Sequence, residues 1–135
     1  MRRNLVGRSA WLAAVMLLLG SVGVPAQSSF PFDHELLLDA APMKGSKRVP
    51  SLDIAANGAA EIALWCDTVK AQLIVAADTI TVIAGPGTGQ QCPPERMRGD
   101  EDLLSALTQA TNWRREGNYL VLTGGRTIRF HLQTN

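Results

Sequence analysis

Cys66 and Cys92 carry the clearest chemistry in this 135-residue chain, because they are its only cysteines. Two thiols can form one disulfide, bind a metal or act in redox chemistry. Their spacing is not that of a CxxC motif, and only His34 and His131 could add imidazole ligands to a metal site. We therefore predict a structural disulfide between Cys66 and Cys92 rather than a metal site or redox chemistry.

Residues 1–26 predict a cleaved export leader. Arg2, Arg3 and Arg8 are followed by the apolar run 10–19 and by Val24-Pro25-Ala26, a small-residue cleavage site. The run is shorter than the roughly 20 residues of a membrane-spanning helix, so we expect cleavage after Ala26 and no stable membrane anchor. The Arg2-Arg3 pair leaves the twin-arginine route open beside general secretion. The leader places the mature chain in the periplasm or outside the cell, where a disulfide persists.

The mature chain is short and nearly neutral. We expect a flexible lead-in over 27–31 and one domain over 32–135, folding as a monomer. Cleavage of the leader removes three arginines, so the mature chain has ten Lys and Arg residues against twelve Asp and Glu residues. A net charge of −2 argues against a nucleic-acid binder that relies on phosphate neutralisation.

Alternating apolar residues predict a chain built mainly from strands. Asn57-Gly58, Ala77-Asp78 and Gly117-Asn118 mark tight hairpin turns between them. Along the last strand, Ile128, Phe130 and Leu132 should face inward, with Arg129 and His131 outward. The expected strands cover residues 32–38, 52–54, 60–65, 71–75, 79–83, 113–115, 119–123 and 126–132.

One helix is predicted between the fifth and sixth strands. Asp100 is the expected N-cap, because Asp100-Glu101-Asp102 suits the positive end of the helix dipole. The apolar face is formed by Leu103, Leu104, Leu107 and Ala110. Strands followed by a helix and further strands indicate an α+β domain with antiparallel connections.

The segment before this helix, residues 84–98, is predicted to be a loop pinned by Cys92. Its Gly85-Pro86-Gly87-Thr88-Gly89 run is no phosphate cradle, because no Gly-Lys-Ser/Thr follows. The segment could instead bind an envelope protein as an interaction loop. Alternatively, this chain could act like a proteinase inhibitor and present residues 85–97 to a protease. Its candidate residues are Gly85, Gly87, Gly89, Pro93, Arg96 and Arg98.

Three aromatic residues, Trp65, Trp113 and Tyr119, are candidates for a ligand-binding face, with packing in the core as the alternative. An enzyme is not expected. Ser46, Ser51 and Ser105 lie in no nucleophile-elbow sequence, and neither histidine stands beside a nucleophile in the sequence.

The order of these features resembles the META or HslJ-like domain of bacterial envelope proteins. The resemblance runs from Phe32 to Leu132. It rests on a strand ending in Cys66, the hairpins after it, Gln91-Cys92-Pro93 before an acid-led helix, and the closing hairpin from Gly117 to Phe130. The family usually has Gly and Asn around the first cysteine, where this chain has Trp65 and Asp67, and an opening tryptophan where it has Phe32 to Leu36.

The resemblance implies a fold and a broad role. The implied fold is a compact, antiparallel, barrel-like sheet of about eight strands with one packed α-helix. The implied role is that of a stress-related protein without a cofactor. With the leader and the cysteines, it leads us to expect a non-enzymatic interaction module of the cell envelope.

Overall fold

The computed structural model describes residues 29–134, and the leader predicted over 1–26 lies outside this range. The order of elements is five strands, one helix and three strands, as predicted. The bounds are β1 (His34–Leu38), β2 (Ser51–Ile54), β3 (Ala59–Ala63), β4 (Thr68–Ala76), β5 (Thr79–Gly87), α1 (Pro94–Thr108), β6 (Asn112–Glu116), β7 (Tyr119–Thr123) and β8 (Ile128–Leu132).

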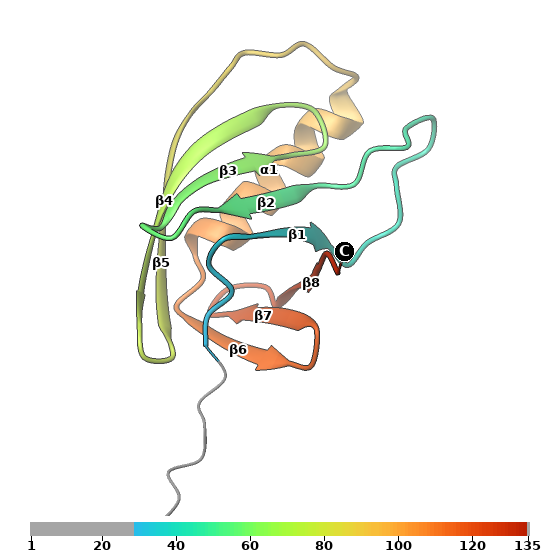
Figure 1. Cartoon of the computed structure of the whole chain (residues 1–135). Coiled ribbons are helices and arrows are strands. Elements are labelled where there is room, and N and C mark those ends of the chain that lie inside the picture. Colours follow the sequence, from blue (N-terminus) through green and yellow to red (C-terminus); the bar gives the residue numbers. More distant parts are fainter. Residues whose placement is uncertain (1–28, 135) are drawn as a thin grey trace, which may run out of the picture.

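The strands form a closed antiparallel barrel in which each pairs with its neighbour in sequence and β8 returns to β1 (Figure 1). Tight turns make this order possible, and Gly58 has a positive φ of 82° at the β2–β3 hairpin. The barrel is weakest between β5 and β6, which share one residue pair, Thr79 with Asn112. This α+β barrel confirms the expected fold class.

The core lies between the barrel wall and α1. Inward residues alternate along the strands as predicted, and Leu52, Ile54, Ile128 and Phe130 are all buried. Figure 1 shows α1 behind β2 and β3, and its Leu103, Ala106 and Leu107 belong to the same apolar cluster as the strand residues. The helix and the inward faces of the strands therefore share one apolar core.

The predicted flexible lead-in ends in residues that are packed. Phe30 and Pro31 are buried. The Phe30 ring lies 4.8 Å from that of Phe32 and meets Trp113 edge to face at 5.1 Å between ring centroids. The apolar character of these residues outweighs their position near the end of the domain.

The predicted start of the helix was wrong. Helix α1 begins at Pro94, and Asp100 lies inside it. Pro93 is the N-cap residue and a proline occupies the first turn, where its lack of an N–H group is harmless. The prolines therefore set the start of the helix and leave the Asp100 carboxylate available for another contact.

Candidate functional site

The turn between β3 and β4, formed by Trp65, Cys66 and Asp67, is held by several contacts to distant parts of the chain. We call these three residues the Cys66 corner. The structure joins Cys66 to Cys92 by a disulfide. The backbone N–H of Leu64 also donates to the carbonyl of Asp67 across the turn, at 2.8 Å. The corner is thus fixed both to its own strand and to the segment that enters α1.

Asp100 holds the Cys66 corner from the helix side. Its two carboxylate oxygens accept hydrogen bonds from the backbone N–H groups of Cys66, at 2.9 Å, and Asp67, at 2.8 Å. Asp100 is the one charged residue among the buried residues of the described chain. A buried carboxylate needs such donors, because leaving it unpaired in the protein interior is costly.

Asp67 in turn fixes the segment that follows β5. Its carboxylate accepts a hydrogen bond from the Thr88 hydroxyl and from the backbone N–H groups of Thr68 (2.6 Å), Thr88 (3.1 Å) and Gly89 (3.1 Å). The Thr88 hydroxyl bond is the main cause that lowers the pKa of Asp67 from 3.8 to about 2, with the backbone donors adding to it. Gly87 must be a glycine here, since a Cβ atom would lie 2.4 Å from an Asp67 oxygen.

The predicted loop over 84–98 is much shorter in the structure. Gly85 and Gly87 belong to β5, and Arg96 and Arg98 belong to the first turns of α1. Only residues 88–93 form a connection, with Gly89 in it and Pro93 as the N-cap of the helix. The sequence showed the glycines and prolines but not that β5 continues through the first two glycines. We call residues 88–93 the tethered loop, because Asp67 holds one end and Cys92 the other.

An apolar cavity lies beside the tethered loop. Its volume is about 230 Å³. Met97 is 40% exposed at its edge. Its lining residues include Leu64, Val69, Met97 and Leu104. No pattern in the sequence indicates this hollow, which lies where α1 packs beside the β3–β4 turn.

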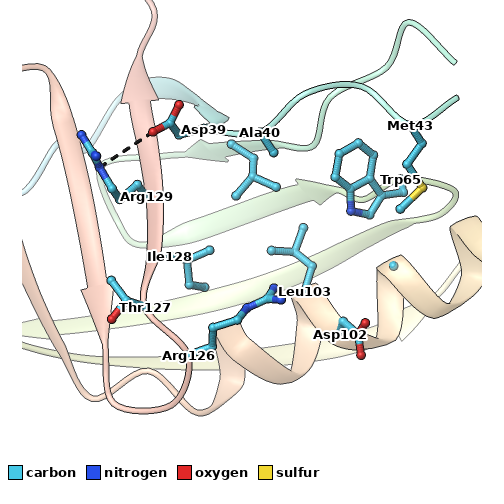
Figure 2. Close-up of a pocket in the computed structure, with 12 residues that line it drawn as sticks. Asp39, Ala40, Met43, Trp65, Asp102, Leu103, Arg126, Thr127, Ile128 and Arg129 are labelled. Atoms are coloured by element: carbon cyan, nitrogen blue, oxygen red, sulfur yellow. Dashed lines mark ion pairs between the residues drawn. The ribbon is translucent and has the colours of Figure 1, made fainter.

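A separate cavity of about 430 Å³ lies on the Trp65 side of the corner. Figure 2 shows it between the 39–50 connection, the middle of α1 and the start of β8. The side chain of Trp65 lies against the helix at Gly99, where a Cβ atom would come within 2.8 Å of the indole ring. Neighbouring residues of one turn thus border two different cavities.

The three candidate aromatic residues do not form one face. Trp113 lies on Phe30, and its indole Nε1–H donates to the carbonyl of Ala77 at 2.9 Å. Tyr119 lies under the guanidinium of Arg129, 4.2 Å from its ring centroid. Of the three, only Trp65 lines a described cavity.

The histidines do not meet a nucleophile in the described chain. His34 is exposed, and its Nδ1 lies 2.7 Å from the carbonyl oxygen of Phe32. The His131 ring lies 6.3 Å from that of Tyr119. Within residues 29–134 no group of three or more His, Cys, Asp or Glu side chains could hold a metal ion.

The barrel and the paired cysteines suggest a protein family, and comparison with known families identifies it. The META domain matches residues 34–135. The chain belongs to the META domain family. This confirms the resemblance drawn from the sequence. A search of curated proteins finds no match.

Two solved structures share the fold of this META domain. A protein from Burkholderia xenovorans, solved by NMR, has a TM-score of 0.60 at 19% identity, covering 86% of this chain and 99% of its own. Another NMR structure has a TM-score of 0.59 at 13% identity, covering 74% of this chain and 89% of its own. At these identities the likeness extends to the fold alone.

No helix within the described residues is long and apolar enough to cross a bilayer.

Proposed function

We propose that this META domain protein is an exported, non-enzymatic interaction module of the cell envelope, and that it binds a partner protein through the tethered loop. The observation that supports this most directly is the double attachment of that loop. Asp67 accepts hydrogen bonds from Thr88 and Gly89 at one end, and the disulfide holds Cys92 at the other. A loop already held in place loses less conformational entropy when it binds.

The surroundings of the loop suit a protein partner. Residues 88–91 are exposed, so they offer polar contacts at a rim. The adjoining cavity offers apolar contacts from Leu64, Val69 and Leu104, with Met97 partly exposed at its edge. An apolar centre beside a polar rim is the usual composition of a protein interface.

The inhibitor alternative has less support. A protease takes its substrate in extended form, whereas Arg96 and Arg98 lie in α1. Only residues 88–93 remain to be presented, and this segment contains no basic residue. We therefore favour a partner that is not a trypsin-like protease.

Binding can be tested by capture from envelope extract with the oxidised protein. Met97→Lys places a charge at the edge of the cavity, and Ile74→Lys is the matched control at another exposed apolar residue. We expect one envelope protein to be recovered by the wild type and the Ile74 variant, and lost with Met97→Lys and with Cys66→Ser/Cys92→Ser. Recovery that is equal for all four proteins, or the absence of any specific protein, would contradict the proposal.

Export is a separate part of the proposal and has its own test. The protein should appear in the periplasmic or extracellular fraction, and N-terminal sequencing should begin at Gln27. A cytoplasmic protein that retains Met1 would rule out the exported role without affecting the fold.

A further inference from the structure

The cavity beside Trp65 has the features of a small-ligand site. Its volume of about 430 Å³ falls within the range of small-molecule pockets. The apolar part of its lining comes from four regions that are far apart in the sequence: Leu38 and Met43, then Trp65, then Leu103, and then Ile128. An apolar ligand could therefore be enclosed by the strands, the helix and the 39–50 connection at once.

Arg126 supplies a cation that the protein itself leaves uncommitted. It forms no hydrogen bond or ion pair with another residue in the 29–134 range. Arg129, on the same cavity, differs from it. Its Nε lies 3.8 Å from an Asp39 oxygen, and its guanidinium carbon Cζ lies over the Tyr119 ring. Arg126 is thus the arginine of this cavity that is free to bind an anion.

Trp65 adds a second donor. Its indole Nε1–H has no hydrogen-bond acceptor within the described part of the chain, in contrast to that of Trp113. Figure 2 shows the indole nitrogen of Trp65 and the guanidinium of Arg126 turned toward the space between them. The flat face of an indole also favours stacking with another aromatic ring. Two donors beside a flat apolar wall suit a planar molecule that carries acceptor oxygens.

We propose that this cavity, which we name the Trp65 cavity, binds a small aromatic carboxylate. The ring would lie against Trp65 and the apolar lining, and the carboxylate would accept hydrogen bonds from the Arg126 guanidinium, whose paired donors match its geometry. Asp102 also borders the cavity, and its negative charge opposes an anionic ligand. This proposal does not depend on the protein partner at the tethered loop, which lies on the other side of the Cys66 corner.

The test compares two probes with the same ring, 1-naphthoate and the neutral 1-naphthalenemethanol. Trp11, Trp65 and Trp113 are the three tryptophans of the chain, so the full chain carrying Trp11→Phe and Trp113→Phe reports on Trp65 alone. We expect saturable quenching by naphthoate, and at least about tenfold weaker binding of the alcohol, because a hydrogen bond to a charged group is lost. Calorimetry on the unsubstituted chain provides a second measurement.

Three charge variants identify the groups responsible. Arg126→Gln should remove the preference for naphthoate, whereas Asp102→Asn should tighten naphthoate binding and leave the alcohol unchanged. Arg114→Gln, on β6 and paired with Glu116, is the control and should change neither affinity. All three residues are exposed, so the variants should fold, which circular dichroism can verify. Equal binding of both probes, a preference that survives Arg126→Gln, or no binding of either at millimolar concentration would overturn the proposal.

Discussion

At the scale of single residues, Asp100 holds the Cys66 corner to the helix through two hydrogen bonds. Asp100→Asn replaces one of its two acceptor oxygens with an NH₂ group that faces an N–H donor. We expect a loss of about 2–3 kcal/mol in the free energy of unfolding, because one bond to a charged acceptor is lost and a buried N–H is left unpaired. Urea denaturation measures this. Asp102→Asn, at an exposed position of the same helix, should change stability by less than about 0.5 kcal/mol.

Asp67 should make stability depend on pH in the acid range. Its folded pKa is about 2, below the ordinary 3.8, chiefly because the Thr88 hydroxyl donates to the carboxylate. Its contribution is therefore complete above about pH 4 and is lost as the pH falls through about 2. We expect wild type to be more stable than Asp67→Asn at pH 5, and the difference to shrink toward pH 2. A difference that is constant across this range would contradict the assignment.

Trp65 and Asp67 are also the two positions where the chain departs from the usual pattern around the first cysteine. The structure gives each a structural contact: Asp67 binds the start of the tethered loop, and Trp65 lies on the helix at Gly99. Such contacts join residues more than 20 positions apart, so no local pattern could have predicted them. The sequence identified both residues as unusual without indicating what they touch.

At the scale of elements, the close contact between α1 and the Cys66 corner rests on Gly99. An alanine here would normally stabilise a helix by about 1 kcal/mol. Its Cβ would lie 2.5 Å from Met43 Cε and 2.8 Å from Trp65 Cδ1, so the ring must move. We expect Gly99→Ala to destabilise the wild type but to stabilise a Trp65→Ala background. A double-mutant cycle in urea measures this coupling, and additive effects of the two substitutions would contradict the contact.

The elements differ in how far the sequence predicts them. Alternation correctly assigned the inward residues Ile128 and Phe130, and turn residues located the hairpins. The start of α1 was misplaced because an acidic residue before an apolar face is typical of an N-cap, whereas Asp100 instead binds backbone N–H groups 33 and 34 residues away. The long loop was predicted because glycines usually end strands, yet at Gly87 the glycine is needed for the approach of Asp67.

At the scale of the whole molecule, closure of the barrel depends on a narrow seam. Besides the pair Thr79 and Asn112, Trp113 of β6 is bound to the turn that precedes β5. Its backbone N–H donates to the carbonyl of Asp78 at 2.9 Å, and its indole N–H donates to the carbonyl of Ala77. We expect Trp113→Phe to cost about 1 kcal/mol through the indole bond. Hydrogen exchange should then quicken at Ile80, whose N–H bonds to Thr111 across the seam, and not at Leu36 on the far side. An equal increase in the exchange rates of the Ile80 and Leu36 amides would contradict a weak seam between β5 and β6.

The disulfide acts on the whole molecule because it constrains the unfolded chain. It closes a segment of 26 residues, for which the chain-entropy estimate is about 3.5 kcal/mol. That is a large share of the stability of a domain this small. We expect Cys66→Ser/Cys92→Ser to lose about this much in urea denaturation, and a reductant to destabilise the wild type by a similar amount. The same reductant must leave the double variant unchanged, since otherwise its effect would not come from this bond. If the variant and the wild type unfold at the same midpoint concentration of urea, the disulfide adds no stability and the tethered loop is held by Asp67 alone.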